Sequence, residues 1–306
     1  SWSASELDEL ARCPYRYFLR YRLGLDPVEE PEEELSLTPA EAGLLLHDIL
    51  HTLGKDVAAG KGWGDVAPAS KKAFASFAKK NPTGLPGLYL LRRREIERDA
   101  AVFVEWERGR AGDPQAYRVA AVEHRFKVAE ERDLPAFRGR VDRIDRGPRS
   151  EAEIIDYKYR DGKNEKAPLE WILHGLASQI PVYLSFARTL SPLPPDVRAT
   201  LLFLKHGVRP VTVAGEQWKA VRDGWAEALS GWIALDRSGM FPPLPHHRFS
   251  YAGSHPPRYC DACLFADHCR VSPRFEGTDR ETEALARRME EDPALRAIVE
   301  HRPAAR

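Results

Sequence analysis

The sequence predicts an α/β protein, and two observations carry that prediction. Three segments with the alternating polarity of strands follow one another closely, separated only by charged turns that contain Gly or Pro. Segments with helical periodicity stand before and after this group. The order along the chain is therefore helices, strands, a helix, short strands and a helix. We interpret this order as an α/β domain that carries a helical insertion.

The region before the strands is predicted to be helical. Ser5 is the expected N-cap of the first helix, and Cys13-Pro14 is expected to kink or break it because proline removes a helical hydrogen bond. Thr38-Pro39 has the cap-then-proline pattern of a helix start. Helices are expected at 6–21, 38–53, 68–80 and 87–110. An acidic loop is expected at 29–34 and a Gly- and Lys-rich linker at 54–64.

The remaining chain alternates between predicted strands and helices. Strands are expected at 117–128, 136–145, 152–159, 197–204 and 209–213, and helices at 169–190, 216–238 and 279–300. Trp218, Trp225 and Trp232 recur every seven residues, which predicts one apolar helix face packed in the core. Pro181 falls inside a predicted helix and would ordinarily bend it. A Pro-rich stretch covers 241–258.

Composition excludes several classes of protein. The 46 Lys and Arg balance 46 Asp and Glu, which argues against a polybasic nucleic-acid binder. No apolar stretch approaches the roughly 18 residues of a membrane span, and no secretory signal is present, so no membrane partner and a cytoplasmic location are expected. The charge is uneven, however: 1–35 hold four basic and nine acidic side chains, and the region 36–278 has a net charge of +6. The start at Ser1 rather than Met suggests part of a longer polypeptide.

The four cysteines predict a metal or cluster site. Cys260, Cys263 and Cys269 form a C-x2-C-x5-C group, and Cys13 lies almost the whole chain away. Without a secretory signal, such a group indicates ligands rather than disulfides. The loop-rich surroundings argue against buried unligated thiols, and cysteine-only ligation with irregular spacing favours an iron–sulfur cluster over zinc. Zinc remains the alternative, with a histidine completing the set from among His246, His247, His255 and His268.

Asp142, Asp156 and Lys158 form a candidate hydrolytic centre. Asp156 and Lys158 are two apart on an expected strand, so their side chains project to the same side. Asp142 can meet Asp156 if the two strands are neighbours. Two carboxylates suit Mg²⁺ or Mn²⁺, and an ammonium group beside them can orient the attacking water and stabilise negative charge. The alternative is an ordinary surface ion-pair ladder, completed by Arg140, Arg143 and Asp145.

Three further polar residues extend this centre. His47 lies at the core edge of a helix, and its imidazole is a competent metal ligand, although a single histidine there is more often a packing residue. Gln179 and Tyr183 are four apart and therefore share one helix face. The amide could hold a water or a phosphate, and the phenol could stack on a base or contact a phosphate. Glu123, on the strand before Asp142, could touch a metal or pair with an arginine.

Taken in order, these residues resemble the RecB-type PD-(D/E)xK nuclease family, and specifically its iron–sulfur branch. That branch includes the C-terminal nuclease domain of the AddB subunit of AddAB helicase–nucleases and the exonuclease V group. The matching motifs are Ser3-x-Ser5, Ala11-Arg12-Cys13-Pro14-Tyr15-Arg16-Tyr17-Phe18, Gly43-x3-His47, the run from Gly139 to Asp145, Ile154-Ile155-Asp156-Tyr157-Lys158, Gln179-x3-Tyr183 and the C-terminal cysteine group. The resemblance implies a restriction-endonuclease-like core, with a small mixed central sheet flanked by helices.

The resemblance also implies a role for each motif residue. Mg²⁺ or Mn²⁺ would be bound by His47, Asp142, Asp156 and the Tyr157 backbone carbonyl. Lys158 would assist the water, and Gln179 and Tyr183 would support substrate. All four cysteines, Cys13, Cys260, Cys263 and Cys269, would hold a 4Fe–4S cluster that staples the N- and C-terminal segments together.

The function implied is a metal-dependent DNA exonuclease that hydrolyses phosphodiester bonds at single-stranded ends in repair or recombination. Any helicase motor would lie on a partner or another part, because the chain has no G-x4-G-K-[ST] loop. The alternative is a non-catalytic module that binds DNA ends and contains iron–sulfur or zinc. The expected parts are an N-terminal helix and acidic loop at 1–35, a nuclease core at 36–240 with an insertion at about 54–115, a cysteine segment at 241–275 and a charged C-terminal helix or tail at 276–306.

Overall fold

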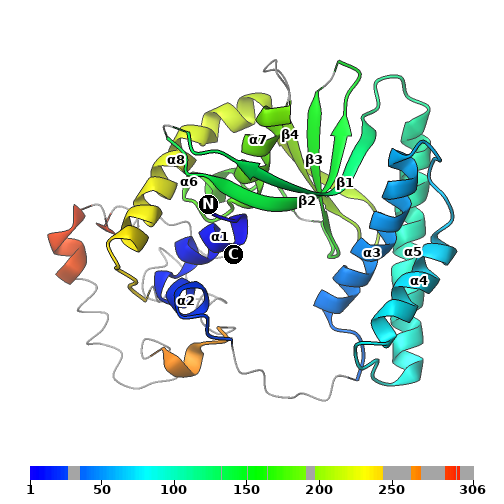
Figure 1. The fold of residues 1–306 in the computed structure, drawn as a ribbon, viewed down its shortest axis with the longest axis horizontal. Helices are drawn as coiled ribbons and strands as arrows, with labels where there is room; N and C mark the ends of the chain where they lie inside the picture. Colours follow the sequence, from blue (N-terminus) through cyan, green and yellow to red (C-terminus); the bar gives the residue numbers. More distant parts are fainter. Residues whose placement is uncertain are drawn as a thin grey trace.

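A mixed five-stranded sheet lies between two layers of helices, as Figure 1 shows. The computed structural model describes residues 1–26, 35–131, 133–149, 151–163, 165–190, 197–243, 263–269, 287–293 and 295–296. The strand order is β1-β2-β3-β4-β5, which is also the order along the chain. The predicted α/β class, with a mixed sheet flanked by helices, is confirmed.

The five strands form close to where their polarity patterns place them. They are β1 (Arg118–Val128), β2 (Phe137–Arg146), β3 (Ala152–Lys158), β4 (Arg198–Phe203) and β5 (Arg209–Ala214). Only the β3–β4 pair is parallel, and the other three neighbouring pairs are antiparallel. A parallel pair needs a crossover connection, and the helices between β3 and β4 supply it. Every strand boundary lies within one residue of its prediction.

One face of the sheet is covered by α3 (Pro39–Ala58), α4 (Val66–Ala78) and α5 (Pro86–Ala111). The predicted cap of α3 is confirmed, because Thr38 and Glu41 form a reciprocal capping box. The helix continues to Ala58, beyond its predicted end at Leu53, so the expected linker at 54–64 is partly wrong. The reason is packing: Gly54 lies so close to Val122 of β1 that an added Cβ would be 2.8 Å from the valine side chain.

The other face is covered mainly by α7 (Gln179–Leu190) and α8 (Gly215–Arg237), with α1 (Ala4–Arg12) at its edge. The three tryptophans of α8 are buried, as predicted. The chain continues from α1 through α2 (Pro14–Tyr17) and the π-helix η1 (Phe18–Arg22). The break expected at Cys13-Pro14 is present, but the cap of α1 is Ser3 rather than Ser5, because Glu6 completes a capping box with Ser3.

The helix predicted at 169–190 is two helices, α6 (Leu169–Leu173) and α7. Gly175 lies between them with φ of +71°, a left-handed conformation that ends a helix and that glycine adopts readily. Pro181 therefore falls in the first turn of α7, where the backbone N–H groups have no helical partner. Proline at this position removes no helical hydrogen bond, which explains how α7 accommodates it.

The C-terminal residues that the structure describes lie against the N-terminal helices. Met289 and Leu295 pack in one apolar cluster with Leu10 and Tyr17. A short 3₁₀ helix, η2 (Ala266–His268), follows Cys263. The acidic run at 29–34, Cys260, most of the Pro-rich stretch and most of the predicted 279–300 helix lie outside the described residues. Across the described ranges, no helix is both long and apolar enough to cross a membrane.

Candidate active site

Asp142 and Asp156 come together where the pairing of β2 with β3 ends. The antiparallel ladder joins Arg146 to Ala152 at one end and Arg143 to Ile155 at the other, and the two aspartates are the next residues. Asp142 Oδ2 accepts a hydrogen bond of 2.7 Å from the Tyr157 N–H, which fixes the orientation of its carboxylate. The predicted meeting of the two carboxylates is thus a consequence of strand register.

Helix α3 places His47 against this pair. Its Nδ1 lies 3.4 Å from Asp142 Oδ1, and its Nε2 lies 3.0 Å from the Tyr157 carbonyl oxygen. Leu46, Ile49 and Leu50 anchor this part of α3 in the core. Burial lowers the pKa of His47, but the hydrogen bond and negative charge of Asp142 outweigh it and raise the pKa overall.

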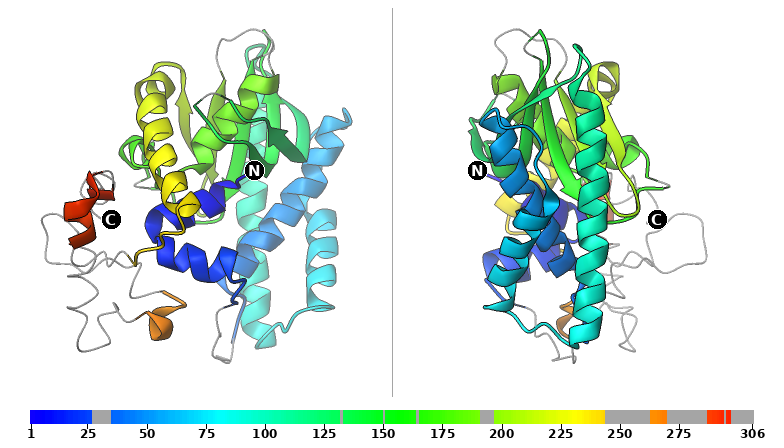
Figure 2. Two further views of the ribbon diagram at one scale, coloured as in Figure 1. Left: turned by 60° about the vertical axis from the view of Figure 1, so that its left-hand side comes forward. Right: turned by 90° about the vertical axis from the view of Figure 1, so that its right-hand side faces the viewer.

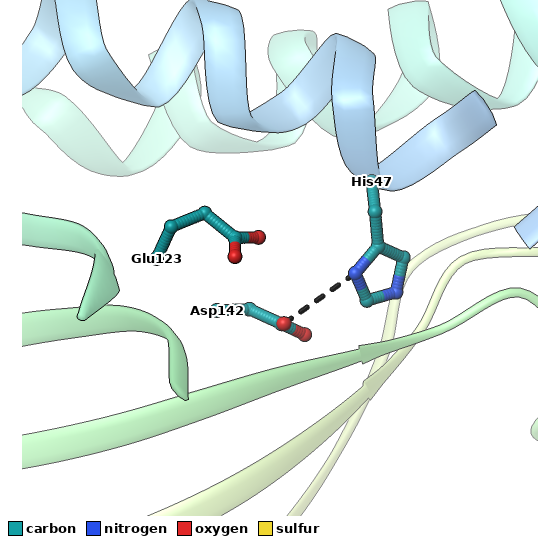
Figure 3. A group of neighbouring side chains, drawn as sticks. All are labelled: His47, Glu123 and Asp142. Carbon is teal, nitrogen blue, oxygen red and sulfur yellow. Dashed lines mark ion pairs between the residues drawn. The ribbon is translucent and has the colours of Figure 1, made fainter. Parts of the chain in front are cut away.

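Glu123 of β1 completes a cluster with His47 and Asp142. One ligand atom from each lies within 4.8 Å of the others, and Figure 3 shows the three side chains pointing toward one another. Among the residues the structure describes, no other group of three such side chains is this close. Glu123 Oε2 also lies 2.9 Å from Arg140 Nε. Glu123 therefore lies where it could contact a metal and also pairs with an arginine, the two roles that the sequence left open. Burial raises the pKa of Glu123, and the positive charge of Arg140 opposes that rise.

The side chains of β1 do not alternate regularly between the two faces of the sheet around Glu123. Val122 packs on Gly54 of α3, whereas His124 stacks on Phe186 of α7, at a centroid distance of 5.7 Å. In a regular strand, residues two apart share a face. Glu123 has φ of +50°, a left-handed conformation that is uncommon for residues other than glycine. The strand therefore changes sides at Glu123. This is why alternation along the sequence does not reveal its carboxylate as part of the site.

Asp156 is held by a second set of partners. Its Oδ1 accepts hydrogen bonds from Gln179 Nε2 at 2.7 Å and from the Tyr183 hydroxyl at 2.9 Å. Lys158 Nζ lies 2.6 Å from Asp156 Oδ2. Burial raises the pKa of Asp156, and although the charge of Lys158 opposes this, Asp142 adds to the rise. The structure thus brings every predicted residue of this centre into one region, with Asp156 turned toward Lys158, Gln179 and Tyr183.

The start of α7 is tied to the N-terminal helix. The backbone N–H of Ser178, the residue before Gln179, donates a 2.6 Å hydrogen bond to Asp8 Oδ1 of α1. Burial raises the pKa of Asp8 to about 6, although this hydrogen bond and the charge of Arg12 oppose the rise. Asp8 was not singled out in the sequence, because its partner is distant along the chain.

A cavity of about 1030 Å³ opens beside Lys158 and Gln179. Its wall carries side chains of both charges: four further basic ones, from Arg12, Arg160, Lys163 and Lys166, and four acidic ones, from Asp8, Asp161, Glu165 and Glu170. The half-buried Trp171 also lines it. The basic groups and the indole are the types of side chain that contact phosphates and bases. Of the candidate site residues, Lys158 and Gln179 border this cavity, and its basic side chains could contact phosphates of a ligand that reaches Lys158.

The cysteine segments lie near each other. Cys13 lies between α1 and α2, and Cys263 and Cys269 flank η2; all three are partly exposed. The Tyr15 hydroxyl of α2 is 3.5 Å from the carbonyl oxygen of His268, and η2 lies close to α2 in both Figure 1 and Figure 2. The remaining cysteine, Cys260, and the candidate zinc ligands His246, His247 and His255 lie outside the described residues.

Comparison with known proteins gives a match over most of the chain. A family model described as the PD-(D/E)XK nuclease superfamily matches residues 1–270. The chain is 29% identical over 218 residues to one subunit of the ATP-dependent helicase/deoxyribonuclease of Moorella thermoacetica, which is 62% of this chain and 18% of that protein. It is 28% identical over 210 residues to the corresponding helicase/deoxyribonuclease subunit from Thermoanaerobacter sp. strain X514, which is 60% of this chain and 17% of that protein.

The chain thus spans less than a fifth of the length of these curated relatives. Among solved structures, a candidate exonuclease from Eubacterium rectale aligns with 85% of this chain and 92% of its own. The identity is 11% and the TM-score is 0.42.

Proposed function

The chain belongs to the PD-(D/E)XK nuclease superfamily, and from that premise we propose that it hydrolyses phosphodiester bonds of DNA with the aid of Mg²⁺ or Mn²⁺. The observation that carries the proposal is the junction of Asp142 and Asp156 at the end of one strand ladder, with Lys158 2.6 Å from the second carboxylate. The proposal is supported by two carboxylates and a cationic group that lie close together, with Lys158 bordering the adjoining cavity.

The donor set suits a hard divalent cation. We propose His47, Asp142, Asp156 and the Tyr157 carbonyl as ligands, with Glu123 as a further oxygen donor. The His47 ring lies between two of these oxygen donors, with Nε2 3.0 Å from the Tyr157 carbonyl oxygen and Nδ1 3.4 Å from Asp142 Oδ1, and hard divalent cations prefer oxygen ligands. When bound, the cation would lower the pKa of a coordinated water and neutralise charge on the phosphate.

Lys158 and the α7 residues have separate tasks in this proposal. The Lys158 side chain is 30% exposed, so its ammonium group can reach a ligand. It would orient the attacking water and stabilise the negative charge that develops on the phosphate. Gln179 and Tyr183 hold Asp156 in one orientation through their hydrogen bonds to Oδ1. Tyr183 is buried, which favours this positioning role over stacking on a base.

We propose that the substrate is a single-stranded DNA end, cut exonucleolytically during repair or recombination. The support is the set of basic side chains in the cavity beside Lys158 and the names of the relatives, which are helicase/deoxyribonuclease subunits much longer than this chain. A helicase motor would then be supplied by a partner or by another part of a longer polypeptide. The site of action would be the cytoplasm.

We further propose that Cys13, Cys260, Cys263 and Cys269 hold a 4Fe–4S cluster. The support is the cysteine-only donor set and the contact between α2 and η2, which brings the segments of Cys13 and Cys269 together. Anaerobically purified protein should contain iron and sulfide, and Cys263→Ser should lower the iron content. If the purified protein is colourless and contains zinc but no iron, the cysteines form a zinc site and the cluster proposal is wrong.

The nuclease proposal is tested by incubating the protein with end-labelled single- and double-stranded DNA in Mg²⁺, Mn²⁺ or chelator. Cleavage is expected with either cation and not with chelator. Lys158→Ala should cut at least a hundredfold more slowly yet still bind DNA. The matched control is Lys79→Ala, which removes an exposed lysine just past α4 and should cut normally. If the unmutated protein binds DNA but never cuts it with either cation, the non-catalytic end-binding module is the correct function.

A further inference from the structure

Four basic side chains oppose each other in pairs across β1 and β2. Arg125 stands directly opposite Arg140, and Lys127 directly opposite Arg138. We call these four residues the cationic ladder. Like charges placed directly opposite on antiparallel strands destabilise the sheet. Two consecutive pairs of this kind therefore lower the stability of the folded protein, and packing within the sheet gives no reason for their presence.

The cationic ladder forms one exposed surface. All four side chains are exposed, while the alternate residues Phe126, Val128 and Phe137 are buried on the opposite face of the strands. Gly139 keeps that opposite face tight, because an added Cβ there would be 2.7 Å from the Phe126 ring. The four basic residues line a shallow groove of about 530 Å³, whose remaining lining is Ser3, Gly139 and the Phe126 ring, which reaches it past the glycine.

Acidic partners offset only half of this charge. Arg140 pairs with Glu123 at 2.9 Å, and Arg138 pairs with Glu6 at 2.7 Å. No carboxylate among the described residues lies within 4.0 Å of the charged nitrogens of Arg125 or Lys127. The groove is therefore left with two cations that an anionic ligand could neutralise.

The ladder begins at the candidate active site. Arg140 contacts Glu123, and Glu123 shares its cluster with His47 and Asp142. From there, the second basic pair lies two residues farther along each strand, a step of roughly 6.6 Å. This step is close to the separation of neighbouring phosphates in an extended nucleic-acid strand. A strand whose scissile phosphate sits at Asp142 could thus place its next phosphates over the ladder.

We propose that the cationic ladder binds the phosphate backbone of the DNA strand next to the scissile bond. This inference rests on the proposed nuclease function and adds a binding surface on β1 and β2, separate from the cavity beside Lys158. The contacts would be to phosphates, so they would hold the strand in place without selecting its sequence.

The test compares Arg125→Gln/Lys127→Gln with Lys79→Gln/Lys80→Gln, which removes the same charge from exposed residues just past α4. Binding of a fluorescent single-stranded oligonucleotide is measured in chelator over a range of salt concentrations, so no cleavage occurs. The ladder variant should bind on the order of tenfold more weakly at low salt, and its slope of log K against log[salt] should be about 1.4 less negative. The control should match the unmutated protein.

A melting experiment separates binding from a structural role. Because the ladder opposes like charges, its neutralisation should leave the melting temperature unchanged or raise it. An unaltered affinity and salt slope in the ladder variant would overturn the inference while leaving the nuclease proposal intact. A lowered melting temperature with unaltered binding would show that the four residues serve the fold. Absence of cleavage by the unmutated protein in Mg²⁺ and Mn²⁺ is the separate result that would remove the nuclease proposal.

Discussion

Asp8 of α1 accepts a 2.6 Å hydrogen bond from the backbone N–H of Ser178, the residue that precedes Gln179 at the start of α7. The helix that ends beside Cys13 therefore supports the helix that orients Asp156. The cysteine segment and the candidate active site are joined through this one contact as well as through the shared core.

The stability of the protein should depend on the protonation of Asp8. Burial raises the pKa of Asp8 to about 6, so the folded state holds this proton more tightly than the unfolded chain. Its stabilising contribution is present below about pH 4, the pKa of an unfolded aspartate, and is lost as pH rises through about 6. Asp8→Asn keeps an acceptor for Ser178 without the charge. We expect this variant to melt at a higher temperature than the unmutated protein at pH 8, and the difference to disappear near pH 4. An equal difference at both pH values would contradict the assignment to Asp8.

Glu123 should contribute to binding of the cation. Glu123→Gln removes a charged oxygen donor from the cluster with His47 and Asp142, so Mn²⁺ affinity should fall about tenfold or more. Isothermal titration with Mn²⁺ in the absence of DNA measures this directly. Glu130→Gln, an exposed residue just past β1, is the matched control and should bind Mn²⁺ normally. If the Glu123→Gln variant binds Mn²⁺ with unchanged affinity, Glu123 is not a ligand and its role is only to pair with Arg140.

Tyr183→Phe should lower both stability and turnover. The variant keeps the ring but loses the 2.9 Å hydrogen bond to Asp156, and this should reduce the free energy of unfolding by about 1 kcal/mol. Turnover should fall, with little change in DNA affinity, because the hydroxyl acts through Asp156. Tyr89→Phe is the control, since that hydroxyl makes only a 3.5 Å contact with the Phe74 carbonyl oxygen. Chemical denaturation and single-turnover cleavage are the two measurements.

Gly54→Ala and Gly109→Ala should have opposite effects on stability. Both glycines lie within helices, where alanine is favoured by about 1 kcal/mol. Gly109 has no atom within 4 Å of an added Cβ, so its replacement should stabilise the protein. Gly54 would place its Cβ 2.8 Å from the Val122 side chain, and overpacking of this kind costs about 1–3 kcal/mol. Because Val122 precedes Glu123, Gly54→Ala should also weaken Mn²⁺ binding, and normal Mn²⁺ affinity would argue against this coupling.

Much of the fold could be predicted because its signals are local. The five strands alternate in polarity, so their limits are visible in the sequence, and the spacing of Asp156 and Lys158 places both side chains on one side. The meeting of Asp142 with Asp156 needed only the assumption that consecutive strands are neighbours.

The features that were missed depend on contacts between distant residues or on unusual backbone conformations. The extension of α3 to Ala58 depends on Val122, and the break before α7 depends on Gly175 with its positive φ. The capping box of Ser3 and Glu6 was visible in the sequence, but Ser5 competed with it. Glu123 was considered from the sequence with its role left open, because the left-handed φ that turns its side chain toward the site is not visible in an alternation pattern.

The packing of the N-terminal helices also bears on when the protein can complete its folding. Leu10 and Tyr17 share their apolar cluster with Trp232, Met289 and Leu295, so α1 and α2 cannot complete their core until almost the whole chain has left the ribosome. Contacts of such long sequence separation slow folding. During synthesis, a partial chain that lacks Met289 and Leu295 would therefore have incompletely packed N-terminal helices.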